Sequence, residues 1–312
     1  MDFKRITEQL NLRAQCQRYR VPLLQCPQFL FLIMGIIIIG AAITAYLIGM
    51  RYIEDPEIIA LMVLTLSVIL FIFTYIITIS FERLAEANRM KSEFVKIVSH
   101  QLRSPITNVS WAIDSLMSGA LGRIQKSQLE YFKILKENSS RMKELIRDLL
   151  ITSRIEEGAL PIRKEKVSLV KVVESLISEF RPFAFASNVK VEFDFDKDLP
   201  EIFTDYHQVK VVIENLLDNA IRYIKKKGKV KIRLGKKETD IYFRIEDNGI
   251  GIPEEDQKYI FQKFFRSKSE EKQGTGLGLF ITKSIIERLD GKIWFESEEG
   301  KGTTFWFSLP IK

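Results

Sequence analysis

The hydrophobic positions of this 312-residue chain follow three successive patterns, and the first is a pair of long uncharged runs. Residues 29–50 and 58–81 contain no charged side chain. A helix needs about 20 apolar residues to cross the roughly 30 Å of a bilayer core, so each run is long enough to span it. Only residues 51–57 separate the two runs. The pattern therefore predicts a transmembrane helical hairpin at 29–81, with no extracellular domain.

Basic residues flank this hairpin on both sides. They are Lys4, Arg5, Arg13, Arg18 and Arg20 before it, and Arg83, Arg89 and Lys91 after it. The connecting loop carries one arginine against three acids. By the positive-inside rule, both termini are expected in the cytoplasm, which makes residues 1–28 a cytoplasmic N-terminal segment. Cys16 and Cys26 in that segment are then expected to be reduced thiols.

The second pattern is a pair of amphipathic helices, in which apolar residues recur at intervals of three and four. The first stripe consists of Phe94, Val98, Leu102, Ile106, Val109, Ile113 and Leu116. The second lies on a helix from about 126 to 157 and consists of Leu129, Phe132, Leu135, Met142, Leu145 and Leu149. Residues 118–122, with two glycines, predict a loop between them. One antiparallel hairpin covers neither stripe fully, so a dimeric four-helix bundle is favoured over packing of both stripes on the C-terminal domain.

The third pattern, after a break at residues 156–161, mixes short strands and helices. Apolar and polar side chains alternate in 189–195, 230–234 and 241–245, and in two runs between 294 and 309. Helical patterns lie between them at about 168–181, 206–226 and 278–290. This order predicts an α+β sandwich. The expected domains are thus the hairpin at 29–81, a helical domain at 82–158 and the sandwich at 159–312.

His100, one of two histidines, lies on the first amphipathic helix but away from its apolar stripe. It stands two residues from both Val98 and Leu102, so at about 100° per residue its side chain points to the opposite side. Ser104 follows one helical turn later on the same face. Pro105 removes a backbone donor, so a bend is expected just after the histidine. These features predict that His100 is solvent-exposed and lies on a surface where its imidazole can react.

Two motifs in the C-terminal region carry polar groups suited to a nucleotide. Asn215, Asn219 and Arg222 share one side of a helix. Amide oxygens can ligate Mg²⁺ and an arginine can pair with phosphate, although an ordinary solvated face has the same composition. Asp247 ends a strand just before the glycine-rich turn at 249–251. A carboxylate there can accept a hydrogen bond from the exocyclic amine of adenine, and the glycines permit positive φ.

Two further motifs supply backbone donors and small polar groups. Residues 274–279, Gly-Thr-Gly-Leu-Gly-Leu, open a helix, and N–H groups at a helix N-terminus attract phosphate. Residues 302–305, Gly-Thr-Thr-Phe, form a small polar turn entering the last strand. The spacing matches neither a dinucleotide fingerprint nor a P-loop. Each motif is a modest signal alone, but their order behind an outward histidine is specific.

From about residue 88 to its end, the chain resembles the sensor histidine kinases of bacterial two-component systems. The resemblance implies a dimerisation and phosphotransfer hairpin, followed by an ATPase domain of the kind shared with gyrase, Hsp90 and MutL. It implies autophosphorylation of His100 from ATP and Mg²⁺, and transfer of the phosphoryl group to an aspartate of a separate response regulator. It also implies a homodimer. The membrane hairpin lies outside the resemblance, and its two uncharged runs give the expected location, the bacterial inner membrane with both termini in the cytoplasm.

The resemblance assigns roles to individual residues. The catalytic positions are His100, which is phosphorylated, Gln101 and Ser104. The implied ATP-binding residues are Asn215, Asn219, Arg222, Tyr223, Asp247, Gly249, Gly251, Phe264, Arg266, Gly274, Thr275, Gly276, Leu277, Gly278 and Thr303. Asn215 and Asn219 are also the implied Mg²⁺ ligands. Residues 261–266 look like the phenylalanine box before an ATP lid, which here runs to about Gly274.

Two positions depart from the family pattern. Gln101 stands where the family has an acid that orients the imidazole, and Arg222 stands where it has lysine. A glutamine carbonyl can still accept the imidazole N–H, less strongly than a carboxylate. The expectation is a working but slower kinase. Ser104 matches the residue that positions water for dephosphorylating the regulator, so a phosphatase activity is also implied.

Other functions account for parts of the sequence. A conformational ATPase would not need the His100 motif, and a scaffold without kinase activity would not need intact asparagine and glycine motifs. The net charge of +7 is concentrated beside the hairpin and forms no basic stripe interleaved with aromatic residues, so no nucleic-acid partner is expected. His207 is expected to be a surface or capping residue, not a second acceptor.

Overall fold

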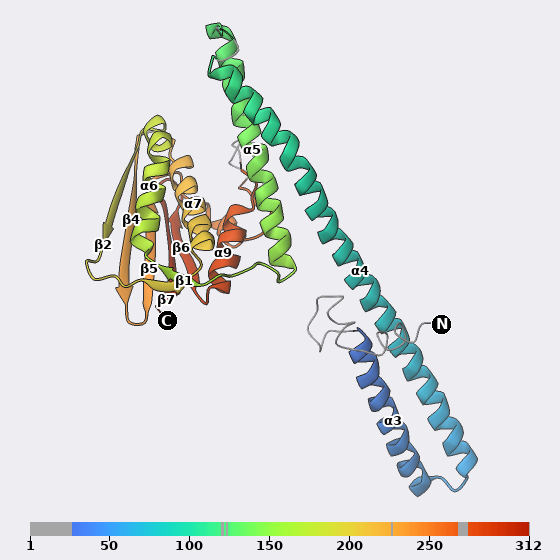
Figure 1. Ribbon diagram of the computed structural model, residues 1–312. Coiled ribbons are helices and arrows are strands. Elements are labelled where there is room, and N and C mark those ends of the chain that lie inside the picture. Colours follow the sequence, from blue (N-terminus) through green and yellow to red (C-terminus); the bar gives the residue numbers. More distant parts are fainter. Residues whose placement is uncertain (1–26, 120–121, 123, 226, 268–273, 312) are drawn as a thin grey trace. The chain divides into compact units, whose positions relative to one another are not determined.

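The computed structural model describes residues 27–119, 122, 124–225, 227–267 and 274–311 (Figure 1). The predictions for residues 1–26, including both cysteines, and for part of the lid lie outside these ranges. The chain divides into two compact units, residues 1–97 and 98–312, each described here by itself. The elements follow the order expected from the sequence: two apolar helices, then an amphipathic helical hairpin, then a mixed segment of strands and helices.

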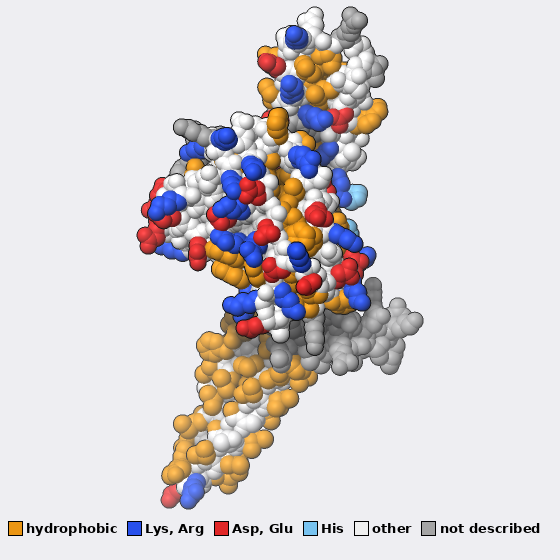
Figure 2. Space-filling view, turned by 90° about the vertical axis from the view of Figure 1, so that its left-hand side faces the viewer, with side chains coloured by type: hydrophobic (Ala, Val, Ile, Leu, Met, Phe, Trp, Pro, Cys, Tyr) orange, Lys and Arg blue, Asp and Glu red, His pale blue; other side chains and the backbone are white. Residues whose placement is uncertain are grey.

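The first unit contains two apolar helices, α3 (Pro27–Tyr52) and the first part of α4 (Pro56–Met117). Both helices are long and apolar enough to cross a membrane, with a mean hydropathy of 2.6 in their most apolar windows. Hydrophobic side chains cover their surface (Figure 2). Hydroxyl groups on them bond within the helix; Thr65 Oγ1, for example, donates to the Leu61 carbonyl at 2.7 Å. Such internal pairing is what a lipid-facing helix requires, so both are candidate membrane spans.

The second unit begins with a helical hairpin formed by the end of α4 and by α5 (Lys126–Glu156). The Ser139 hydroxyl donates to the Ile106 carbonyl at 3.4 Å and fixes the register of the two helices. Helix α4 runs through Pro105 without interruption. Within the single chain the apolar stripe of α4 is only partly covered, as expected for one hairpin: Leu102 and Val109 are about half exposed, while Ile113 is buried. One hairpin covers only one side of each helix.

The remaining part is an α+β domain built on a five-stranded sheet in the order β2-β4-β5-β7-β6. Strands β2 and β4 are parallel, and the other neighbours are antiparallel. The strands are β2 (Val189–Phe195), β4 (Gly228–Lys237), β5 (Asp240–Asp247), β6 (Lys292–Glu298) and β7 (Gly302–Pro310). These five bear out the alternating patterns. A two-stranded sheet of β1 (Glu165–Val167) and β3 (Ile202–Thr204) has strands too short for the sequence pattern to predict.

Three helices cover one face of the large sheet: α6 (Leu169–Ala186), α7 (Tyr206–Arg222) and α9 (Gly278–Arg288) (Figure 1). The alternate residues of β5 and β7 that face them are buried, and Phe243 stacks on Phe307 with 4.8 Å between ring centroids. Helix α6 continues past Pro182, where the pattern ended it, because Ala184 is buried in the core. A short helix, α8 (Glu254–Gln257), was not predicted.

Side-chain contacts fasten the linker after α5 to this domain. Leu160 is buried in its core, and Arg288 donates to the Leu160 carbonyl at 3.1 Å. The buried carboxylate of Asp205 accepts the backbone N–H groups of Arg163 at 2.6 Å and Gln208 at 3.0 Å. Asp205 thus caps α7, and His207 beside it is exposed, the surface position expected for it. The chain turns away from α5 at Gly158, which has φ +67°, and from Leu160 onward the linker is held by the α+β domain.

Candidate active site

A cleft of about 750 Å³ opens beside α7 in the second unit. Its walls come from α5, α6, α7, the end of β5 and the turn before α9. Twelve of the candidate residues line it: Asn215, Asn219, Arg222, Tyr223, Asp247, Gly251, Arg266, Gly274, Thr275, Gly276, Gly278 and Thr303. Gly249, Phe264 and Leu277 do not. The four separate motifs of the sequence thus meet at one cavity.

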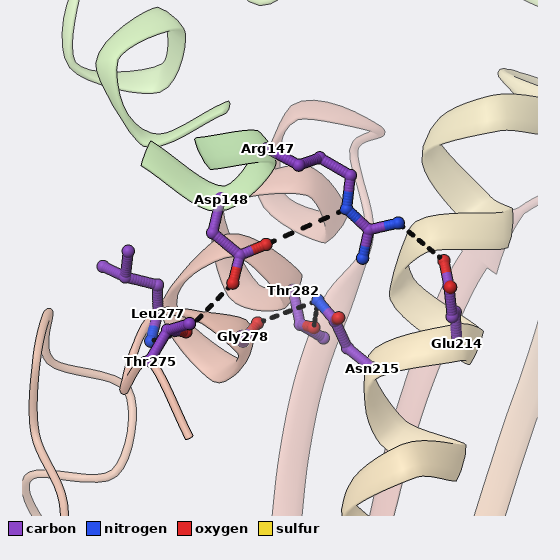
Figure 3. Close-up of polar contacts among 8 residues, drawn as sticks. All are labelled: Arg147, Asp148, Glu214, Asn215, Thr275, Leu277, Gly278 and Thr282. Atoms are coloured by element: carbon purple, nitrogen blue, oxygen red, sulfur yellow. Dashed lines mark hydrogen bonds and ion pairs between the residues drawn. The ribbon is translucent and has the colours of Figure 1, made fainter. Parts of the chain in front are cut away.

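Helix α7 presents its polar side to the cleft because its other side is packed against the sheet. Leu216 and Leu217 are fully buried there. Asn215 donates through Nδ2 to the Gly278 carbonyl at 3.2 Å and to Thr282 Oγ1 at 3.4 Å (Figure 3). With its amide nitrogen used by α9, the oxygen of Asn215 remains as the acceptor on that side chain.

Arg222 lies at the end of α7 and forms a bidentate ion pair with Asp218. The closest nitrogen–oxygen distance is 2.7 Å, and the two residues are one helical turn apart. The pair holds the guanidinium along the wall of the cleft. The carbonyl of the next residue, Tyr223, accepts the backbone N–H of Ile250 at 3.2 Å and joins the end of α7 to the turn after β5.

Asp247, the last residue of β5, lies at the base of the cleft. Its Oδ1 accepts the backbone N–H groups of Gly249 at 2.8 Å and of Thr303 at 3.3 Å. Burial raises the pKa of Asp247 to about 6, although these two hydrogen bonds act in the opposite direction. The carboxyl is therefore held rigidly while keeping its second oxygen for a ligand.

Two glycines allow the backbone to close around this aspartate. Gly251 has φ +68°, and a Cβ added there would lie 2.0 Å from the Glu298 carbonyl oxygen. Gly302 has φ +121°, and its added Cβ would lie 2.1 Å from the carbonyl oxygen of Asp247. Both positions need a residue without a side chain, for conformation and for space.

The turn at Gly274–Leu277 leads into α9 and is called here the glycine turn. Gly276 has φ +69°, and its carbonyl accepts the backbone N–H of Phe264 at 2.9 Å. Phe264 itself has φ +61° and a side chain that is 65% exposed, whereas Phe265 lines the cleft. The cleft wall thus includes Phe265, which the sequence motif does not single out, while Phe264 points elsewhere because its backbone has the left-handed conformation.

Helix α5 forms a wall of the same cleft, a contact that no motif in the sequence predicts. Asp148 is only 8% exposed, and its Oδ2 accepts the hydroxyl of Thr275 at 2.9 Å (Figure 3). Burial raises the pKa of Asp148 and also that of Glu144, one turn earlier on α5. Arg147 pairs with Glu214 of α7 at 3.4 Å. The only sequence signal for this wall was an acid in a stretch rich in leucine and isoleucine.

His100 is exposed on α4, as the helical phase predicted. Gln101 and Ser104 are exposed as well. None of the three lines the cleft. The phospho-acceptor candidate and the nucleotide candidate residues therefore form two separate groups.

The donor set of the cleft fits a nucleotide with a magnesium ion. Within the described ranges, no group of three or more His, Cys, Asp or Glu is placed to hold a metal. Magnesium commonly takes few protein ligands and several from phosphate and water. The amide oxygen of Asn215 and the side chain of Asn219 suit that kind of site.

Two family descriptions match successive parts of the chain. Residues 90–158 match the His Kinase A (phospho-acceptor) domain. Residues 204–312 match the histidine kinase-, DNA gyrase B- and HSP90-like ATPases. The first range contains His100, and the second contains all the candidate residues of α7, β5 and the glycine turn.

Two relatives of the chain carry the names of sensory kinases. The adaptive-response sensory kinase SasA of Synechococcus sp. (strain JA-3-3Ab) is 32% identical over 73% of this chain and 62% of its own length. The sensor protein kinase WalK of Staphylococcus aureus is 32% identical over 73% of this chain and 55% of its own. The chain therefore spans less than two thirds of either relative.

A solved structure shares the fold. Full-length ShkA in complex with AMPPNP superposes with a TM-score of 0.60 at 22% identity, covering 70% of this chain and 46% of that one. The fold, the two family matches and the named relatives agree with the resemblance seen in the sequence. The chain belongs to the sensor histidine kinases of bacterial two-component systems.

Proposed function

We propose that this protein is a membrane sensor kinase that phosphorylates its own His100 from ATP and passes the phosphoryl group to an aspartate of a separate response regulator. The observation that carries the proposal is the pairing, in one chain, of a solvent-exposed histidine within the phospho-acceptor match and a cleft lined by twelve nucleotide candidates within the ATPase match.

The adenine end of ATP is assigned to Asp247 and Tyr223. The free oxygen of Asp247 would accept the exocyclic amine, and its fixed orientation suits that contact because two backbone N–H groups hold the other oxygen. Phosphates would lie at the glycine turn, against the N-terminus of α9. Arg222, Arg266, Gly278 and Thr303 also line the cleft and belong to the proposed ATP-binding set. Gly249 and Leu277 are buried and would support the binding residues from behind the lining, whereas Phe264 is exposed and would contact ATP from outside the present cleft wall.

Magnesium would be held by Asn215 and Asn219 together with the phosphates, and it would neutralise charge that develops on the transferred group. In the transfer, the lone pair of a neutral His100 imidazole forms the N–P bond while the bond from the γ-phosphorus to the ADP oxygen breaks. The side-chain carbonyl of Gln101 would accept a hydrogen bond from the other imidazole nitrogen, whose proton is then released to water. Positioning and charge stabilisation carry most of the rate in such reactions.

We also propose that the protein is a homodimer and that it lies in the membrane. The half-exposed Leu102, Val109, Leu135 and Met142 on the helical hairpin are suited to a second copy of this chain in a four-helix bundle. The candidate spans α3 and α4 are suited to the bacterial inner membrane with both termini cytoplasmic. The proposed domains are 1–28, 29–81, 82–158 and 159–312. Ser104 would give the protein a regulator phosphatase activity.

The test uses the full-length protein in lipid vesicles with γ-labelled ATP and Mg²⁺. We expect acid-labile label on the wild type and on His207→Ala, and none on His100→Ala. His207 is the matched control because it is the other histidine and is also exposed. Label that survives His100→Ala, or its absence from a wild-type protein that binds ATP, would contradict the proposal.

A further inference from the structure

The contact between Asp148 and Thr275 links the helical hairpin to the glycine turn. Asp148 lies near the C-terminal end of α5, and Thr275 lies 127 positions later, just before α9. Figure 3 shows the Asp148 carboxylate directed at the Thr275 hydroxyl, with Asn215 and Gly278 of the cleft beside it. The contact thus reaches the part of the ATPase domain where phosphates are expected.

The Thr275 hydroxyl is used twice. Its oxygen accepts the backbone N–H of Leu277 at 3.1 Å, and its proton is donated to Asp148 Oδ2 at 2.9 Å. A hydroxyl has one proton, so this proton cannot also serve a phosphate oxygen. The N–H of Leu277, at the start of α9, is one of the donors that an anion at this helix end would seek. With α5 in contact, the hydroxyl proton of Thr275 is therefore taken by Asp148, while the N–H of Leu277 is paired within the turn itself.

Asp148 also places a carboxylate beside the glycine turn, where the phosphates of ATP are proposed to bind. It is 8% exposed, and the positive group closest to it is Arg147, with 4.0 Å between Nε and Oδ1. Arg147 is itself shared with Glu214 at 3.4 Å. Because Arg147 is divided between two carboxylates, it neutralises Asp148 only in part, and two anions in a poorly solvated site repel each other.

We propose that the Asp148–Thr275 hydrogen bond is an autoinhibitory latch: it holds α5 on the glycine turn, and binding of a nucleoside triphosphate with its outer phosphates at that turn opens it. The inference rests on the proposed function, since it assumes that the cleft binds ATP. Coupling of this kind is reciprocal. Weakening the latch must therefore strengthen triphosphate binding, and triphosphate binding must weaken the hold on α5.

The latch is separable from the rest of the α5 contact. Farther along the helix, Glu156 forms an ion pair with Lys263, which does not line the cleft. That pair supports the same helix without involving a group of the glycine turn. Glu156→Gln is therefore a matched control: it removes one charge from α5 at the edge of the interface but leaves Thr275 and Leu277 untouched.

The experiment measures the dissociation constants of AMPPNP and adenosine, both with Mg²⁺, for the full-length protein in detergent. Adenosine is measured by competition and reports the part of the site away from the glycine turn. Asp148→Asn, which keeps the shape and removes the charge, is expected to tighten AMPPNP binding roughly 5- to 20-fold and to leave adenosine unchanged. Asp148→Ala should act in the same direction, and Glu156→Gln should change neither constant.

Three results would overturn the latch. Equal or weaker AMPPNP binding by both Asp148 variants would show that Asp148 supports the bound state. An equal gain for adenosine would show a general effect on the cleft. The same selective gain in Glu156→Gln would show that only detachment of α5 matters. A wild-type protein that binds neither ligand would instead contradict ATP binding itself, and so the proposed function.

Discussion

The backbone N–H of Thr303 donates to Asp247 Oδ1 at 3.3 Å, joining the start of β7 to the end of β5 across 56 positions of sequence. Gly249 donates to the same oxygen at 2.8 Å. These two bonds favour the ionised carboxyl, yet the pKa of Asp247 is raised to about 6 because burial outweighs them. The site therefore holds an aspartate that costs stability when it is charged.

This cost predicts an unusual pH dependence for Asp247→Asn. The folded pKa, about 6, lies above the ordinary 3.8, so the folded state holds the proton more tightly than the unfolded state. The protonated carboxyl of Asp247 therefore makes its full contribution to the free energy of unfolding below about pH 4, and this contribution is lost as the pH rises through about 6. The asparagine variant keeps an acceptor and cannot ionise. By urea denaturation, it should exceed the wild type in stability by up to about 3 kcal/mol near pH 8 and by much less near pH 4.

The same substitution should impair nucleotide binding, because the adenine amine would lose a charged acceptor. We expect the AMPPNP dissociation constant of Asp247→Asn to rise at least about tenfold. Glu246→Gln is the control: its carboxylate is on the neighbouring residue of β5 and does not line the cleft. A variant that is less stable than the wild type near pH 8 and still binds AMPPNP normally would disprove both parts of the argument.

Gly302 and Gly300 offer a matched pair for testing how tightly the turn before β7 closes on Asp247. Both have positive φ, +121° and +81°. An added Cβ meets the Asp247 carbonyl oxygen at 2.1 Å from Gly302, whereas nothing lies within 4 Å of one at Gly300. Gly302→Ala should therefore destabilise the protein by about 2–4 kcal/mol, and Gly300→Ala by about 1 kcal/mol. Equal losses of stability in the two variants, measured by thermal unfolding, would mean that the close approach of residue 302 to the Asp247 carbonyl does not contribute to the cost.

The architecture of the C-terminal domain was predictable because its patterns are local. Alternation in β4, β5 and β7 and the apolar side of α7 depend only on neighbouring residues, and the structure buries those positions. The motif glycines could also be read from the sequence, since a positive φ or a close approach leaves few other choices. Gly251 meets that expectation with φ +68°.

The α5 wall could not be predicted, because it depends on contacts between distant segments. Asp148 reads as one acid on a charged helix, and only its 127-position contact with Thr275 gives it a role. Which of Phe264 and Phe265 lines the cleft depends on a backbone reversal that no periodicity reveals. The half-exposed Leu102 has a related explanation: hydrophobic spacing predicts a contact face but not which chain covers it.

Gln101 provides a test of how much the residue after the histidine contributes to phosphoryl transfer. Both side chains are exposed on α4. A carboxylate accepts the imidazole N–H more strongly than an amide does, so Gln101→Glu should leave the initial rate of His100 labelling unchanged or raise it up to about tenfold. Gln101→Leu, which accepts no hydrogen bond, should lower the rate. A large loss in the glutamate variant would instead give the native glutamine a positive role of its own.

Ser104 tests whether the surface around His100 also removes phosphate from the regulator. It is exposed one turn after the histidine, where its hydroxyl can orient a water molecule toward a docked phosphoaspartate. Ser104→Ala should lower the dephosphorylation rate of a phosphorylated regulator on the order of a hundredfold, whereas Ser104→Thr, which retains a hydroxyl, should keep most of it. The rate is measured as loss of label from the purified regulator, with His100→Ala as the background so that no label returns to the kinase. Unchanged dephosphorylation by the alanine variant would assign the reaction to another group, or to the regulator alone.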